Sequence, residues 1–266
     1  MITFIGAGNM ARSLVEGLIA KGTAASTLRV ADPIEAQRAH YVALGVEAFA
    51  DNAAAVDGAT TVVLAVKPQL AAQVLGPLSL APEQLLLSIA AGVTSHALAA
   101  WTQPDQAIIR CMPNTPALVG SGAAGLYAST ACSAAHRQAA EQILNAVGTV
   151  TWVAEETQLD AVTAVSGSGP AYFFQLMESM IDAGTKLGLS PEVARQLTVQ
   201  TALGAARMAA ETNDEPAQLR QNVTSPGGTT AAALEVMHSR QLPSIIEAAL
   251  TAADHRAAEL GREFGN

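Results

Sequence analysis

The chain has 266 residues, 50% of them hydrophobic, which is enough to bury the core of one α/β domain with an appendage or of two modest domains. Lys and Arg number 14 against 23 Asp and Glu, and the basic residues are scattered, so the net charge of −9 argues against nucleic acid as a partner. Apolar runs are too short to cross a bilayer, the two cysteines have no paired spacing, and no charged leader precedes the first strand, which together predict a cytoplasmic protein without a membrane partner.

Residues 1–152 alternate short β-branched runs with amphipathic segments. This alternation is typical of a parallel sheet with helices on both faces. Strands are expected over the runs ITFIG, LRVAD, TTVVLAV, LLLSIAAG and AIIRCMP, and helices over NMARSLVEGLIAKG and IEAQRAHYVALG. The run SGAAGLYA, a helix over residues 134–146 and a strand near residues 149–153 complete this α/β unit, which we place at residues 1–155.

After residue 155 the sequence has helical periodicity and almost no strand signal, so residues 156–266 are expected to form an all-helical domain. Its helices are predicted over residues 157–187, 191–210, 227–239 and 243–264. Ser190, followed by Pro191 and Glu192, predicts an N-cap, a proline at the first helical position and an acid in the first turn. The Ala- and Gly-rich helix that follows fits either ordinary tight packing or an interlocked subunit interface.

A glycine-rich turn opens the chain. Gly6, Gly8 and Ala11 form G-x-G-x-x-A between the first predicted strand and the first predicted helix. Gly6 permits the tight turn, Gly8 lets the backbone approach a pyrophosphate, and a small residue at position 11 lets helix and strand pack closely. The helix N-terminus then offers unpaired N–H groups to phosphates. This context favours a Rossmann-like NAD(P)-binding domain over a merely structural turn.

Asp32, at the end of the second predicted strand, bears on the choice of cofactor. An acid there binds the ribose hydroxyls of NADH and repels the extra phosphate of NADPH. The alternative is a helix cap before Pro33. Arg38, one turn into the next helix, is a possible phosphate partner, so these residues leave the choice open.

Further walls of the cofactor crevice are expected where other strands end, because ligands bind at the carboxyl ends of strands in such sheets. Lys67 is either an exposed strand-end lysine or a residue near the nicotinamide. Asn52 either reaches the adenosine half or is an N-cap or turn residue. The turns SIAAG and MPNTPA supply more of the same wall. The residues assigned to the crevice in this way are Asn52, Ala65, Val66, Lys67, Pro68, Ala90, Ala91, Gly92 and Asn114.

Six motifs in register, GAGNMA, AVKP, SIAAGV, RCMPNTPA, AVSGSGPAYFF and VTSPGGTT, make the entire chain resemble pyrroline-5-carboxylate reductase. The resemblance implies reduction of the ring C=N of L-1-pyrroline-5-carboxylate to L-proline with NAD(P)H, and an intertwined dimer or higher homo-oligomer formed through the helical domain. It implies NADPH as the preferred cofactor, with NADH also accepted. Besides Asn52 and residues 65–68, the cofactor would touch Ile5, Gly6, Ala7, Gly8, Asn9 and Met10, and the substrate would touch Asn222, Thr229 and Thr230.

The motif SPGGTT has features of a binding site for the carboxylate of a substrate. Ser225 is a plausible N-cap with Pro226 at the first helical position, and Gly227 and Gly228 leave backbone N–H groups uncovered. The position of Thr230 in the family implies that its hydroxyl reaches the ring nitrogen and acts in catalysis. Without the resemblance, a simple turn would be the better explanation of the motif.

The run SGSGPAYFFQLM favours reduction of an imine over oxidation of a hydroxy acid. Hydroxy-acid dehydrogenases that resemble this architecture carry a helical lysine where this chain has Phe173. A protonated imine is already an electrophile and its product amine keeps the proton, so no strong base is needed. A hydroxy-acid dehydrogenase and a non-catalytic nucleotide sensor remain as alternatives, and the five histidines show no metal-ligand spacing, so no metal is expected.

Overall fold

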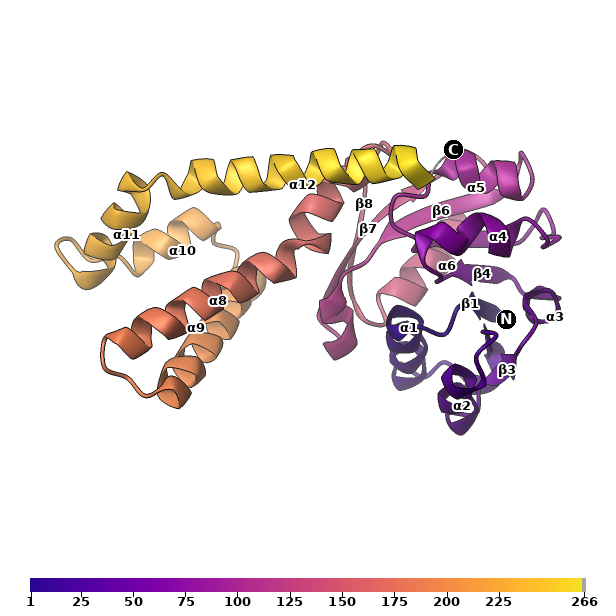
Figure 1. The fold of residues 1–266 in the computed structure, drawn as a ribbon, viewed down its shortest axis with the longest axis horizontal. Helices are drawn as coiled ribbons and strands as arrows, with labels where there is room; N and C mark the ends of the chain where they lie inside the picture. The colour runs from indigo at the N-terminus through magenta and orange to yellow at the C-terminus, as the bar shows by residue number, and fades with distance from the viewer. Residues whose placement is uncertain (265–266) are drawn as a thin grey trace. The chain divides into compact units, whose positions relative to one another are not determined.

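The computed structural model describes residues 1–264, which divide into two compact units (Figure 1). The first unit contains Met1–Ser168 together with the residues from Ala252 onward, and the second contains Gly169–Thr251. The boundary predicted at residue 155 follows the change from strands to helices, whereas these units follow the contacts between residues. The last helix therefore begins in the second unit and ends in the first.

An eight-stranded sheet forms the centre of the first unit, in the order β3-β2-β1-β4-β5-β6-β7-β8. The first six strands are parallel to one another. Strands β2 and β3 lie on one side of β1, and β4, β5 and β6 lie on its other side, which is the doubly wound arrangement. The strands are β1 (Ile2–Ile5), β2 (Leu28–Ala31), β3 (Glu47–Phe49), β4 (Thr61–Leu64), β5 (Leu85–Ser88), β6 (Ala107–Met112), β7 (Gly122–Ala128) and β8 (Gly148–Trp152).

The sheet departs from the expected parallel pattern at β7, which runs antiparallel to β6 and carries the parallel strand β8 beside it. The physical reason is the connection from β6 to β7, which holds only a short 310 helix, Thr115–Val119, and the left-handed Gly120 (φ 70°). A parallel neighbour needs a longer crossover, so this short link returns the chain in the opposite direction.

Helices cover both faces of the sheet, as the alternating sequence predicted. Successive strand residues belong to opposite cores: Phe4, Leu85 and Leu87 lie in one hydrophobic cluster, and Ile5 and Leu86 lie in the other. Helices α1 and α6 pack on the first cluster, and α3, α4 and α5 pack on the second. The helices of this unit are α1 (Asn9–Ala20), α2 (Glu35–Ala43), α3 (Asn52–Val56), α4 (Ala71–Leu75), α5 (Ser95–Trp101), α6 (Ala134–Leu144) and α7 (Gln158–Val162).

The second unit is helical throughout. A π-helical turn, Thr163–Gly167, precedes it, and α8 then begins at Gly169, so the SGSGP run interrupts and restarts the helix. Ser190 caps α9 by accepting a hydrogen bond from the Val193 N–H at 3.3 Å, which confirms the predicted start. The helices are α8 (Gly169–Lys186), α9 (Pro191–Glu211), α10 (Pro216–Asn222), which the sequence did not predict, α11 (Thr229–Ser239) and α12 (Leu242–Phe264).

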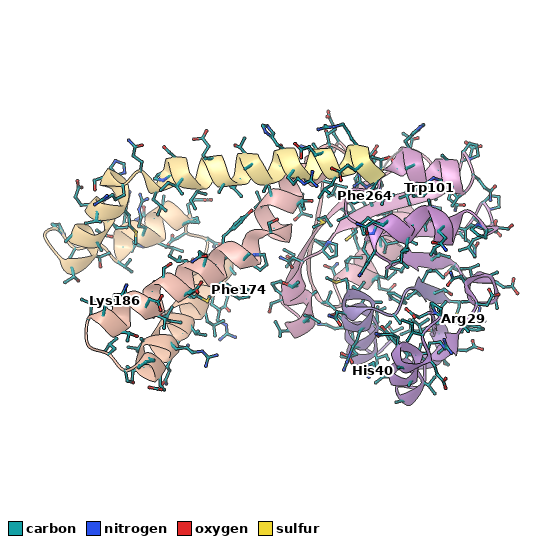
Figure 2. The ribbon with its side chains drawn as sticks, in the orientation of Figure 1. Arg29, His40, Trp101, Phe174, Lys186 and Phe264 are labelled. Carbon is teal, nitrogen blue, oxygen red and sulfur yellow. The ribbon has the colours of Figure 1, made fainter. Side chains whose placement is uncertain are left out.

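The two units bury apolar side chains to very different degrees. Both hydrophobic clusters belong to the first unit, where Phe264 at the end of α12 and Trp101 at the end of α5 pack against the second cluster (Figure 2). In residues 169–251 only Gly169, Ala194 and Thr198 are buried, and Phe174 on α8 is 63% exposed. The second unit therefore lacks a core of its own.

Candidate functional site

The glycine turn after β1 leaves an open approach to the start of α1. Gly6 has φ 98°, and a Cβ there would lie 2.6 Å from the carbonyl oxygen of Ala65, so only glycine fits. A Cβ on Gly8 would meet nothing within 4 Å. Gly8 is the N-cap of α1 and its carbonyl accepts the first intrahelical bond from Arg12 N–H at 2.9 Å. The N–H groups of the first turn are therefore uncapped by any side chain and can face a phosphate.

Asp32 lies directly after β2 and ties this turn to the next loop. Its Oδ2 accepts a hydrogen bond from the Ala7 N–H at 3.0 Å, and its Oδ1 accepts one from the Ile34 N–H at 2.9 Å. The N-cap of α2 is Ile34, so the alternative role of Asp32 as a helix cap is wrong. The Arg38 guanidinium donates to the Asp32 carbonyl oxygen at 2.6 Å, which places a cation at the end of β2.

The segment after β4 lies beside the glycine turn, because the Ala65 N–H bonds the Ile5 carbonyl at 2.8 Å. Val66 is half-buried, Lys67 is exposed, and Pro68 begins a short 310 helix. Asn52 is the first residue of α3, but Asp51 is its N-cap, accepting from the N–H groups of Ala53 and Ala54. The capping alternative for Asn52 is therefore wrong, and its amide makes no hydrogen bond to any other residue in the range 1–264.

Asn114, predicted as a wall residue, holds two loops together. Its Nδ2 donates to the Ser166 carbonyl at 3.0 Å, and its Oδ1 accepts from the Ala123 N–H at 2.9 Å. This tether escaped sequence reasoning because its partners lie 52 and 9 residues away. A direct contact of Asn114 with a cofactor stays a prediction.

The SPGGTT motif of the second unit starts a helix differently from the prediction. Gly228 is the N-cap of α11, so the assignment of Ser225 as N-cap is wrong. The Gly228 N–H bonds the Ser225 carbonyl at 3.0 Å, and Gly227 has φ 69°. Proline and a positive-φ glycine at the two central positions are typical of a type II turn, which delays the helix to Thr229.

The start of α11 has no side-chain cap, since Gly228 has no side chain. The first intrahelical bond runs from the Ala232 N–H to the Gly228 carbonyl at 3.1 Å. The N–H groups of Thr229, Thr230 and Ala231 therefore lack an intrahelical partner and can bind an anion. Thr230 is half-buried, and Asn222 ends α10 with its Oδ1 bonded to Gln218 Nε2 at 2.8 Å.

A sheet of this order with an open glycine turn, joined to an all-helical unit without its own core, defines a dinucleotide-dependent oxidoreductase with a helical second domain. The family model for coenzyme F420-dependent NADP oxidoreductase matches residues 1–92, and that for pyrroline-5-carboxylate reductase dimerisation matches residues 156–260. The chain is 52% identical to the Pseudomonas aeruginosa pyrroline-5-carboxylate reductase, over 99% of this chain and 98% of that protein.

Solved structures of such reductases also superpose on this chain. The pyrroline-5-carboxylate reductase of Coxiella burnetii superposes with a TM-score of 0.94 at 45% identity, covering 97% of each chain. The Plasmodium falciparum pyrroline carboxylate reductase with NADP bound gives 0.84 at 29% identity, covering 98% of this chain and 97% of that one. The chain belongs to the pyrroline-5-carboxylate reductase family. It is an NAD(P)H-dependent oxidoreductase of proline biosynthesis that acts on the C=N bond of pyrroline-5-carboxylate, and its helical domain is a dimerisation domain.

Within residues 1–264, every helix is too short or too polar to span a lipid bilayer. In the same range no group of three or more His, Cys, Asp and Glu side chains could hold a metal ion.

Proposed function

We propose that this chain reduces L-1-pyrroline-5-carboxylate to L-proline in the cytoplasm, with NADPH as the preferred hydride donor and NADH also accepted. The observation that supports the substrate assignment is the uncapped start of α11, whose first turn contains Thr230. The fit of the dinucleotide rests on the open space at Gly8 and the uncapped start of α1.

The substrate carboxylate binds the N–H groups of Thr229, Thr230 and Ala231, with Ser225, Gly227, Gly228 and Asn222 at the rim. Charge-assisted hydrogen bonds contribute roughly 1.5 to 3 kcal/mol each before desolvation losses. With its pyrophosphate held at the glycine turn, the cofactor would supply the hydride from its reduced nicotinamide. The Thr230 hydroxyl aligns the protonated imine and donates to the lone pair that develops on its ring nitrogen as the hydride adds to the carbon. The product amine keeps the proton that the imine carried, so no residue has to act as a strong base.

Parallel assays test this function. NADPH and NADH consumption are measured with pyrroline-5-carboxylate as acceptor, and proline formation is measured at the same time. Stoichiometric formation of proline supports the proposal. Turnover of a 3-hydroxy acid without reduction of pyrroline-5-carboxylate would instead establish the hydroxy-acid dehydrogenase alternative.

The preference for NADPH is proposed from Asp32 and Arg38. Both Asp32 carboxylate oxygens accept backbone N–H groups, which neutralise part of the charge that would repel a 2′-phosphate. Arg38, bonded to the Asp32 carbonyl, is the cation that this phosphate would meet. The same carboxylate still has lone pairs for ribose hydroxyls, which explains why NADH is accepted as well.

Arg38→Ala should lower kcat/KM for NADPH about tenfold and leave that for NADH within about twofold, because one charge-assisted contact with phosphate is worth about 1.4 kcal/mol or more. Steady-state kinetics with both cofactors measure this ratio. Lys21→Ala is the matched control, since it removes one exposed positive charge at the far end of α1. Equal losses with both cofactors would place Arg38 outside the phosphate site.

The dimer is proposed to form through the second unit, which leaves large apolar side chains exposed without a core beneath them. Exposed apolar surface of this extent marks an interface. Light scattering at micromolar concentration should give at least twice the chain mass of 27.2 kDa. Phe174→Asp should shift the protein toward monomer, because it places a charge on the exposed apolar side of α8. A monomeric parent protein would refute this assignment.

A further inference from the structure

A largely buried ion pair lies next to the loop that follows β5. Arg110 lies on β6, in the apolar run AIIRCM, and only 11% of its side chain is exposed. A buried guanidinium needs a partner, since an unpaired charge in an apolar interior is costly. That partner is Glu156, whose Oε1 accepts from Arg110 NH1 at 2.7 Å. Neither residue belongs to the proposed cofactor or substrate contacts.

Glu156 also binds the first residue of α5 with both carboxylate oxygens. Its Oε1 accepts from the Ser95 backbone N–H at 2.6 Å, and its Oε2 accepts from the Ser95 hydroxyl at 2.5 Å. Burial disfavours the charged carboxylate, but the hydrogen bonds from Ser95 and Arg110 outweigh that effect and hold the pKa of Glu156 below its ordinary value. The carboxylate is therefore ionised at neutral pH and remains bonded to three donors.

The loop between β5 and α5 is confined on its other side as well. Gly92 has φ 76°, and a Cβ there would lie 3.3 Å from the Leu260 backbone and 3.3 Å from the Phe264 ring of α12. The cavity beside the loop has only about 30 Å³ and is lined by Ala90, Gly92, Arg110, Met112, Asp160 and Leu260, among others. Because the loop has little space around it, a shift of the residues at its ends would move the loop itself.

We propose that Glu156 is a positioning residue for hydride transfer: by holding Ser95, and being held by Arg110, it sets the position of the Ala90–Gly92 loop against the nicotinamide. The inference rests on the proposed function, because it takes that loop as a wall of the cofactor site. Glu156 touches neither cofactor nor substrate in this assignment and acts through the loop. Its loss should therefore change the geometry of hydride transfer more than the affinity for the dinucleotide, whose phosphates are held at Gly8.

The test compares Glu156→Gln with Glu155→Gln, which removes the same charge from the adjacent, exposed residue. The quantities measured are kcat, the cofactor Kd, the melting temperature, and the primary deuterium isotope effect with cofactor deuterated at C4. A misplacement of about 1 Å, caused by a change far from the chemistry, can cost about 100-fold in rate, so a smaller shift is expected to cost about tenfold. Glu156→Gln should lower kcat about tenfold, raise the isotope effect and change the cofactor Kd less than threefold, while Glu155→Gln leaves all four values at those of the parent.

Ser95→Ala supplies a second variant that keeps the Arg110–Glu156 pair and the backbone bond, and it tests the same link if Glu156→Gln fails to fold. It should lower kcat less than Glu156→Gln and raise the isotope effect in the same direction. The inference is overturned if the folded variants, well below their melting temperatures, have the parent's isotope effect, because Glu156 is then a structural anchor alone. A parent enzyme that does not reduce pyrroline-5-carboxylate would refute the proposed function instead, so the two failures are distinguishable.

Discussion

Gly8→Val should abolish NADPH binding and leave both units folded. Gly8 has φ −73° and ψ −179°, an extended backbone that valine adopts without strain, and a Cβ at this position meets nothing within 4 Å. The branched side chain would therefore fit the protein and occupy the space through which the pyrophosphate reaches the start of α1. We expect the Kd for NADPH to rise at least about 100-fold, equivalent to about 2.7 kcal/mol.

Titration of NADPH binding by fluorescence, together with the melting temperature, measures this effect. Gly8→Ala should give a smaller loss, since one methyl group fills less of the same space. Gly6→Ala is the structural contrast: with φ 98° and a Cβ 2.6 Å from the Ala65 carbonyl, it should lower the melting temperature as well as the affinity. Parent-like NADPH binding by Gly8→Val would mean that the cofactor does not pass over this turn.

Thr230→Ala should lower kcat and kcat/KM together by about 10- to 100-fold, the equivalent of roughly 1.4 to 2.7 kcal/mol for one hydrogen bond in a dry site. The hydroxyl contact strengthens as charge moves off the ring nitrogen, so its loss is felt mainly in the transition state. The backbone N–H groups at the start of α11 remain in place, and alanine is a better helix former than threonine, so neither substrate binding nor stability should fall much.

The matched variant is Thr230→Ser, which keeps the hydroxyl and should retain much of the rate. Kinetics with pyrroline-5-carboxylate at saturating NADPH separate kcat from KM for the three proteins. If Thr230→Ala has the parent's kcat, or loses only cofactor affinity, then the hydroxyl has no chemical role and the motif serves only to begin a helix.

The start of α11 shows where local sequence signals compete. A serine followed by proline is the usual signal for an N-cap and first helical residue, and it was correct at Ser190. At Ser225 the same pair is followed by glycine, which allows a positive φ and a type II turn. The chain forms the turn, so the helix begins at Thr229, three residues later than the cap signal indicated. Helix α10 was missed because Leu219 is the one large apolar side chain among its seven residues, so the segment has little apolar periodicity.

The sequence by itself determined the family, the alternation of strands and helices in the first unit, and the glycine turn, because these depend on residues that are neighbours in the chain. Only the tertiary structure decided that β7 reverses direction, that Asn114 tethers Ser166, and that Glu156 joins Ser95 to Arg110. The partners in those last contacts lie 46 to 61 residues apart. Periodicity and capping patterns extend over a few turns or one strand, so they carry no information on which distant polar groups meet when the sheet closes over its core.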